Sequence, residues 1–168
     1  LKADLYLLQE VKASNTLNEK NILFDQINQI DGEKRNFGNC IISFGPKINR
    51  TEINTKYKGS LIVSEVISAD TKIAVINLYG ILTAISKNQK TVAPNIHNML
   101  SDLTPIFLGW SDEKFKSFIL AGDFNVDKRM DTTEGMYWRK GMRTSQIIFD
   151  RIEDFLLEDC LIKKYPNF

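Results

Sequence analysis

The segment that most restricts the fold is an apolar run that leads directly into Gly-Asp-Phe-Asn, at residues 118–125. Its apolar residues predict a buried strand, and Gly122 permits a sharp turn or the close approach of another backbone. Because side chains two apart in an extended chain share a face, Asp123 and Asn125 point the same way. A carboxylate and an amide therefore lie together at the end of a buried strand, where charged groups are costly unless paired or used.

Two other predicted strands end in polar side chains. The apolar run of residues 5–11 ends near Glu10, and that of residues 72–78 ends with Asn77, followed by Tyr79. Ligand sites in layered α/β folds gather at such strand ends. Taken alone, Glu10 is more simply interpreted as a solvent-facing charge at the rim. Tyr79 is either a half-buried aromatic residue or a phenol that binds a ligand.

The remaining pattern mixes strands and helices and predicts an α/β (α+β) fold. Further strands are expected at residues 37–44 and 60–68, the latter in an antiparallel hairpin with residues 72–78. Amphipathic spacing predicts helices at residues 18–30, at residues 95–108 and after Thr144 or Ser145. We expect a loop or exposed ribbon at residues 47–58 and a loop at residues 81–91.

Length and composition fit one domain covering residues 1–168, and no apolar run is long enough to cross a bilayer. Lys and Arg together number 22 against 21 Asp and Glu, so any contact with nucleic acid must come from a local basic patch. Cys40 and Cys160 are too few for a disulfide framework. This favours a reducing compartment, the cytoplasm or, in a eukaryote, the nucleus.

A basic and aromatic segment follows the Gly-Asp-Phe-Asn stretch. It contains the candidate substrate-binding residues Tyr137, Trp138, Arg139, Lys140 and Arg143. Aromatic rings can stack on bases while Arg and Lys contact phosphates. A surface loop whose aromatic rings tuck beneath it explains the same pattern equally well, so both interpretations stay open.

The polar strand ends carry ligands for a hard cation. Carboxylate, amide and phenol groups suit Mg²⁺ or Mn²⁺ together with a phosphate. The sequence has no cluster of His and Cys, which argues against zinc. His97 is the only histidine and falls in a predicted helix, where a structural or solvent-exposed role is expected.

Three short motifs resemble, in order and rough spacing, the endonuclease/exonuclease/phosphatase superfamily. They are Leu-Gln-Glu-Val at residues 8–11, Ile-Asn-Leu-Tyr at residues 76–79 and Leu-Ala-Gly-Asp-Phe-Asn at residues 120–125. This superfamily includes abasic-site endonucleases, pancreatic-type deoxyribonucleases, retrotransposon endonucleases, inositol-polyphosphate phosphatases and sphingomyelinases. The resemblance implies a four-layer α/β sandwich that hydrolyses phosphate esters with Mg²⁺ or Mn²⁺.

The resemblance also implies roles for individual residues. Glu10 matches the glutamate that ligates the divalent metal. Asp123 matches the aspartate that orients or deprotonates the attacking water, and Asn125 matches the asparagine that contacts the phosphate. Tyr79 matches a phosphate-contacting tyrosine of the abasic-site and retrotransposon branches, and Asn77 is grouped with it as a substrate-binding candidate.

Two parts of the family pattern have no match in the sequence: a first strand with a metal-site asparagine and a late Ser-Asp-His element. We therefore expect a partial fold, with little or no nuclease activity from these residues alone. A nuclease acting on nucleic acid, on DNA rather than RNA, is the favoured function. The alternatives are a phosphoinositide or sphingolipid phosphoesterase and a catalytically silent binding domain of the same fold.

Overall fold

The described part of the chain builds two packed sheets, a separate two-stranded hairpin and a layer of helices. The computed structural model describes residues 3–14, 21–30, 33–69, 71–86, 89–109, 117–126 and 144–166. In chain order the elements are β1 (Leu5–Lys12), β2 (Ile22–Ile30), β3 (Glu33–Ser43), β4 (Lys47–Thr51), β5 (Leu61–Ser68), β6 (Thr71–Tyr79), β7 (Leu82–Ser86), β8 (Gln89–Pro94), α1 (Ile96–Leu108), β9 (Ser117–Asp123), α2 (Thr144–Asp154) and α3 (Cys160–Lys164).

The first sheet is antiparallel, with the strand order β1-β3-β2. The strands predicted at residues 5–11 and 37–44 are confirmed. The helix predicted at residues 18–30 is wrong from residue 22 on, because β2 occupies Ile22–Ile30, and residues 18–20 lie outside the described part of the chain. Leu23 of β2 lies opposite Ile41 of β3, and such cross-strand pairing outweighs a helical spacing of apolar residues.

The second sheet has the strand order β4-β5-β6-β9. The hairpin predicted from residues 60–68 and 72–78 is confirmed as the antiparallel pair β5 and β6. The strand predicted before Gly122 is confirmed as β9, which pairs with β6 in parallel. Of the two possibilities for residues 47–58, the ribbon applies to their first part, where β4 forms the sheet edge.

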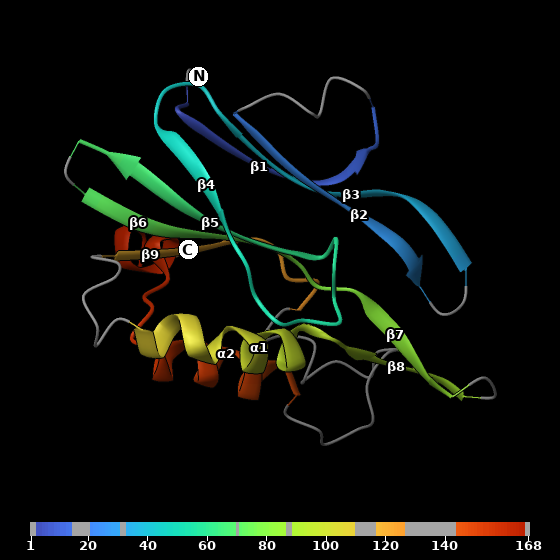
Figure 1. The fold of residues 1–168 in the computed structure, drawn as a ribbon. Coiled ribbons are helices and arrows are strands. Elements are labelled where there is room, and N and C mark those ends of the chain that lie inside the picture. The colour runs from blue at the N-terminus through green and yellow to red at the C-terminus, as the bar shows by residue number, and fades with distance from the viewer. Residues whose placement is uncertain are drawn as a thin grey trace.

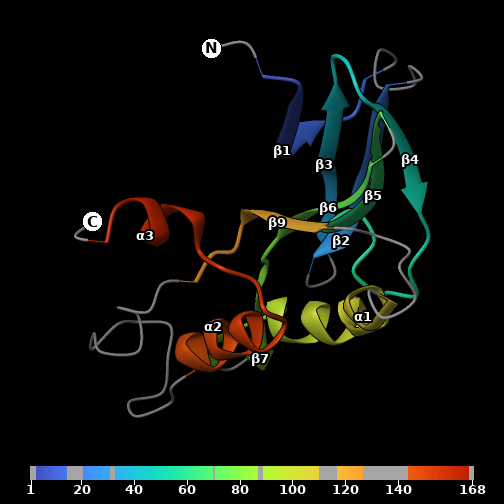
Figure 2. The ribbon, with the colours of Figure 1, turned by 90° about the vertical axis from the view of Figure 1, so that its left-hand side faces the viewer.

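The two sheets pack face to face around an apolar core. Ile41 of β3, Ile62 of β5 and Val75 of β6 are buried in it, and Leu5 and Leu7 of β1 pack against them. In Figure 1 the first sheet lies over the second, and the helices α1 and α2 lie beneath. Figure 2 shows the same stacking from the side, with both helices on the face of the second sheet that is turned away from the first.

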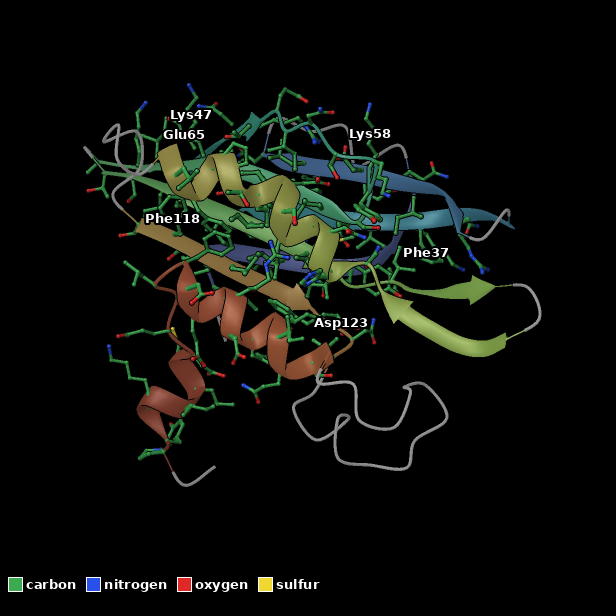
Figure 3. The ribbon with its side chains drawn as sticks, turned by 90° about the horizontal axis from the view of Figure 1, so that it is seen from below. Phe37, Lys47, Lys58, Glu65, Phe118 and Asp123 are labelled. Carbon is green, nitrogen blue, oxygen red and sulfur yellow. The ribbon has the colours of Figure 1, made fainter. Side chains whose placement is uncertain are left out.

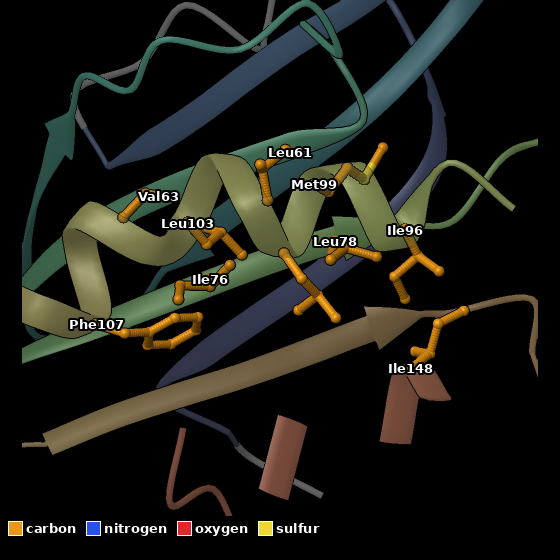
Figure 4. Packing of buried hydrophobic residues seen from close by; sticks show 10 residues of the cluster. Leu61, Val63, Ile76, Leu78, Ile96, Met99, Leu103, Phe107 and Ile148 are labelled. Carbon is orange, nitrogen blue, oxygen red and sulfur yellow. The ribbon is translucent and has the colours of Figure 1, made fainter. Parts of the chain in front are cut away.

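Helix α1 covers the second sheet with an apolar stripe whose residues recur at helical spacing. Its buried residues are Ile96, Met99, Leu100, Leu103 and Phe107. They pack on β5 and β6 and meet Ile148 of α2 (Figure 4). The helices predicted at residues 95–108 and after Thr144 or Ser145 are thereby confirmed.

Two further parts of the chain depart from the sequence-based expectation. The loop predicted at residues 81–91 is wrong, because β7 and β8 form an antiparallel hairpin that projects from the layers (Figure 1). The short helix α3 was not predicted; the Asp159 side chain caps it by accepting the N–H groups of Leu161 and Ile162. No helix in the described segments has both the length and the apolar character needed to cross a membrane.

The layers confirm the predicted α/β (α+β) class. The described residues supply two packed sheets, the separate β7–β8 hairpin and a helical layer on one side, which is a partial form of the expected four-layer sandwich. The arrangement brings the end of β1, in the first sheet, against β6 and β9 in the second.

Candidate active site

The end of β6 lies beside the end of β9. The two strands run in parallel, with Tyr79 opposite Asp123 in the register. Because parallel strands finish at the same edge of a sheet, the residues that follow them emerge side by side. Figure 3 shows Asp123 at the tip of β9, on the side of the molecule from which the β7–β8 hairpin projects.

Glycine at two positions allows these strand ends to approach closely. Gly80 donates its backbone N–H to the Asp123 carbonyl oxygen at 2.7 Å, and a Cβ there would lie 2.1 Å from the Phe124 carbonyl oxygen. Gly122 has a φ of +135°, and a Cβ there would lie 1.9 Å from the Leu78 carbonyl oxygen. Only glycine fits at either position, so the predicted close approach at Gly122 is confirmed.

Asn125 is fixed by two hydrogen bonds just beyond β9. Its backbone N–H donates to Asp123 Oδ1 at 2.9 Å, and its side-chain Nδ2 donates to the Gly80 carbonyl oxygen at 2.8 Å. The φ of Asn125 is 51°, a left-handed conformation that asparagine tolerates better than most residues. The carboxylate and the amide of Gly-Asp-Phe-Asn are thus tied to each other and to the end of β6.

Glu10 reaches this strand end from the other sheet. The register of β1 and β3 shifts between Leu8 and Val11, so that β1 carries one residue more than β3 at a bulge. Glu10 lies in this bulge with a φ of 57°. Its Oε1 accepts a hydrogen bond of 2.6 Å from the Tyr79 hydroxyl group. Glu10 is therefore more than a rim charge, since it joins the two sheets at the ends of their strands.

Burial and two carboxylates raise the pKa of the Tyr79 phenol above its usual value. Burial contributes most, followed by the hydrogen bond to Glu10 and the negative charges of Glu10 and Asp123, while Arg35 opposes the shift. Phe37 packs edge-on against the Tyr79 ring, with the centroids 6.4 Å apart. The phenol is therefore held as a neutral hydrogen-bond donor between two acidic side chains.

The side-chain oxygens of the site suit a hard cation, such as Mg²⁺, that retains most of its water ligands. The described residues contain no group of three or more His, Cys, Asp and Glu side chains placed to hold a metal ion. Mg²⁺ commonly binds through one or two carboxylates together with waters and substrate phosphate oxygens. Glu10 offers its Oε2, which accepts no hydrogen bond from the described part of the chain.

Comparison with known proteins identifies the fold. No family model and no curated protein matches the chain. Among solved structures, the AP endonuclease LMAP from Leishmania major superposes with a TM-score of 0.60 at 14% identity. The match covers 97% of this chain and 60% of that one. The chain has an endonuclease/exonuclease/phosphatase fold.

A second solved structure is the endonuclease domain of TRAS1, a telomere-specific non-LTR retrotransposon. It superposes with a TM-score of 0.49 at 14% identity, covering 91% of this chain and 58% of that one. The chain therefore spans about three fifths of the length of each of these two solved structures.

Within this endonuclease/exonuclease/phosphatase fold, the four residues singled out by the sequence motifs come together. Glu10 and Tyr79 share a hydrogen bond, Tyr79 lies opposite Asp123, and Asn125 hydrogen-bonds Asp123. They come from three strands that are far apart in the sequence. The fold thus gathers one glutamate, one aspartate, one phenol and one amide where strands of the two sheets end side by side.

Asn77 requires a correction. We expected it to bind substrate, but its side chain is fully buried. Its Nδ2 donates to the carbonyl oxygens of Leu8 and Cys40, and its Oδ1 accepts from Gln9 Nε2. A buried side chain whose polar atoms are all engaged inside the protein makes a structural contact between the sheets.

Sequence reasoning missed Arg35, Phe37 and Gly80 as parts of the site. Gly80 comes two residues after the strand predicted at residues 72–78, and this position is the one signal in the sequence that points to it. Arg35 and Phe37 lie on β3 and reach Tyr79 only through the packing of the sheets. His97 lies on α1 in an exposed position, which agrees with the solvent-exposed position expected for it. The basic and aromatic candidates Tyr137, Trp138, Arg139, Lys140 and Arg143 lie outside the described residues.

Proposed function

We propose that this chain carries the phosphate-ester-hydrolysing site of a divalent-metal-dependent nuclease that acts on DNA. The observation that carries the proposal is the hydrogen bond between Tyr79 and Glu10, with Asp123 beside it. The likeness to a solved structure described as an AP endonuclease supports a nucleic acid as the substrate class. Hydrolysis of a phosphodiester needs a positioned water and donors for the growing negative charge, and these side chains supply both.

In this proposal Asp123 orients the attacking water and accepts its proton. Asp123 is exposed, and its Oδ1 is held by the Asn125 N–H, which leaves its second oxygen for the water. Asn125 has one N–H of its amide on the Gly80 carbonyl oxygen, and an amide nitrogen has a second N–H to donate to a phosphate oxygen. Tyr79, which stays protonated, is a further donor.

Glu10 is the residue that would hold Mg²⁺ or Mn²⁺. When bound, such an ion neutralises charge on the phosphate oxygens and lowers the pKa of a ligated water. The contribution of the chain is to fix the carboxylate, since Tyr79 binds one oxygen of Glu10 and leaves the other available to the ion. One carboxylate with waters and phosphate oxygens is a common environment for Mg²⁺.

Cleavage of DNA by the purified chain tests the proposal. The sequence contains no Ser-Asp-His, so weak activity is expected and the protein is used in excess over plasmid and abasic-site DNA. We expect cleavage that depends on Mg²⁺ and that Asp123→Asn abolishes. Cleavage that persists in EDTA, or that Asp123→Asn leaves unchanged, contradicts the assignment of the site.

The same assay separates the alternatives. RNA, phosphoinositides and sphingomyelin are offered in parallel with DNA, and turnover of a lipid phosphate alone would favour the phosphoesterase alternative. Absence of turnover on every substrate, combined with DNA binding, would favour a catalytically silent domain.

A further inference from the structure

Glu10 occupies an unusual place in β1. It lies in the bulge, and its φ of 57° falls in the left-handed region. Few residues other than glycine adopt this conformation, and a strained residue persists only where its surroundings over-determine it. The contacts that fix the neighbours of Glu10 therefore decide where its carboxylate points.

The buried amide of Asn77 supplies these contacts. Its Nδ2 donates to the Leu8 carbonyl oxygen at 3.1 Å and to the Cys40 carbonyl oxygen at 2.9 Å. Leu8 and Cys40 form the last regular pair before the register shifts. The Oδ1 of Asn77 accepts from Gln9 Nε2 at 2.6 Å. A bulge interrupts the backbone hydrogen bonds between two strands. Asn77 supplies hydrogen-bond donors to the Leu8 and Cys40 carbonyl groups beside this bulge.

A second buried amide, that of Asn39, fixes the other half of the Glu10–Tyr79 pair. Its Nδ2 donates to the Ser60 carbonyl oxygen at 2.8 Å and to the Asn77 carbonyl oxygen at 3.4 Å. The Ser60 carbonyl oxygen also accepts the Tyr79 N–H at 2.8 Å. Both Asn39 and Asn77 are fully buried. The buried amides of Asn39 and Asn77 thus bind the backbone next to Glu10 and the carbonyl group that accepts the Tyr79 N–H.

We propose that Gln9 and Asn77 are positioning residues, which aim the Glu10 carboxylate at Tyr79 and at the metal. This inference rests on the proposed function, because it requires Glu10 to be a metal ligand. Neither residue touches substrate, since Asn77 is buried and the Gln9 amide lies on Asn77. They act through the backbone of the bulge, where Gln9 directly precedes Glu10.

The substitution Gln9→Met tests this role with little disturbance of folding, because methionine fills a similar space without the amide. Binding of Mn²⁺ to the full chain is measured by electron paramagnetic resonance, beside DNA cleavage over a range of Mn²⁺ concentrations. We expect Mn²⁺ affinity to fall about tenfold or more, as is typical when residues behind a metal ligand are replaced. Cleavage should recover in part at high Mn²⁺.

Asn77→Asp is the second variant, since it keeps the shape of the side chain and removes the amide donors. Val75→Ala is the matched control. Val75 lies on the same strand, fully buried in the core between the sheets and separate from the buried amides of Asn39 and Asn77. Its replacement lowers stability through a cavity, so it shows what destabilisation alone does to Mn²⁺ affinity.

A loss of Mn²⁺ affinity in Gln9→Met and Asn77→Asp, with Val75→Ala equal to the unsubstituted chain, supports the inference. Equal affinity in all three variants overturns it. A Glu10→Gln chain that takes up as much Mn²⁺ as the unsubstituted chain overturns the proposed function instead, because Glu10 is then no metal ligand. The two failures are therefore distinguishable.

Discussion

Asn125 donates its side-chain Nδ2 to the Gly80 carbonyl oxygen at 2.8 Å, which ties the residue beyond β9 to the residue beyond β6. This bond sets the plane of the amide, because the other end of the residue is held by Asp123 Oδ1. A planar group whose orientation is set before substrate arrives needs no reorganisation when charge develops on a phosphate.

Replacing Asn125 by Asp tests this fixed orientation. The substitution puts an acceptor where the Gly80 carbonyl oxygen needs a donor, and it removes the N–H available to phosphate. We expect cleavage to slow by about a hundredfold or more, with a loss of about 1 kcal/mol in the free energy of unfolding. Asn98→Asp is the control, since Asn98 is exposed on α1 and its amide donates to the Tyr57 hydroxyl group. Equal slowing in both variants would contradict the assignment of Asn125.

Tyr79→Phe removes one hydroxyl group from the site and leaves the ring against Phe37. Glu10 Oε1 then loses its only hydrogen bond from the described residues. We expect a lower cleavage rate and weaker Mn²⁺ binding, measured by single-turnover cleavage and metal titration, with a stability change of only about 1 kcal/mol. Tyr57→Phe removes a hydroxyl group that bonds Asn98 instead and should leave both measurements unchanged.

The raised pKa of Tyr79 also predicts how stability depends on pH. In the unfolded chain a tyrosine loses its proton near about pH 10, while burial, Glu10 and Asp123 make folded Tyr79 keep it to higher pH. The unfolded state therefore binds fewer protons in this range, and stability falls as pH rises. Below about pH 10 the contribution of Tyr79 is constant. Urea unfolding should show a steeper alkaline loss for the unsubstituted chain than for Tyr79→Phe, and parallel curves would contradict the shift.

Gly122→Ala tests the close approach of β6 and β9. A Cβ at Gly122 would lie 1.9 Å from a backbone oxygen, at a φ of +135° that alanine rarely adopts. We expect a loss of more than about 1 kcal/mol in the free energy of unfolding and loss of cleavage, because Asp123 must move. Gly109→Ala is the matched control, since among the described residues nothing beyond its neighbours in the chain and helix lies within 4 Å of a Cβ there, and its φ of −63° suits alanine. It should be neutral or slightly stabilising.

The strands around the core could be predicted because apolar runs and turn residues mark them directly. The incorrect predictions share one cause, because the structure of those segments depends on packing between distant parts of the chain. Residues 22–30 carry apolar residues at a spacing that fits a helix, yet they pair with β3, and the energy of that pairing is not visible locally. The hairpin of β7 and β8 has a polar sequence with little apolar alternation to indicate strands.

The residues of the site also divide into those that the local sequence indicates and those that depend on packing between distant segments. Asp123 and Asn125 could be placed together from their spacing, and the sequence motifs pointed to Glu10 and Tyr79. The direction of Asn77 could not be predicted, because a residue at a strand end faces either a ligand or the opposite sheet. The first sheet packs over β6, and Asn77 bonds Leu8 and Cys40 across that boundary. Arg35 and Phe37 were missed for the same reason.

The parallel pairing of β6 with β9 has a kinetic consequence. The chain leaves β6, forms the β7–β8 hairpin and helix α1, and only then returns beside β6. Contacts between segments this distant carry a large loop-closure cost and slow the folding reaction. Asp123 and Asn125 therefore reach Tyr79 only once this long excursion has closed. We expect partly folded forms of the chain, such as those on a ribosome, to lack the assembled cluster.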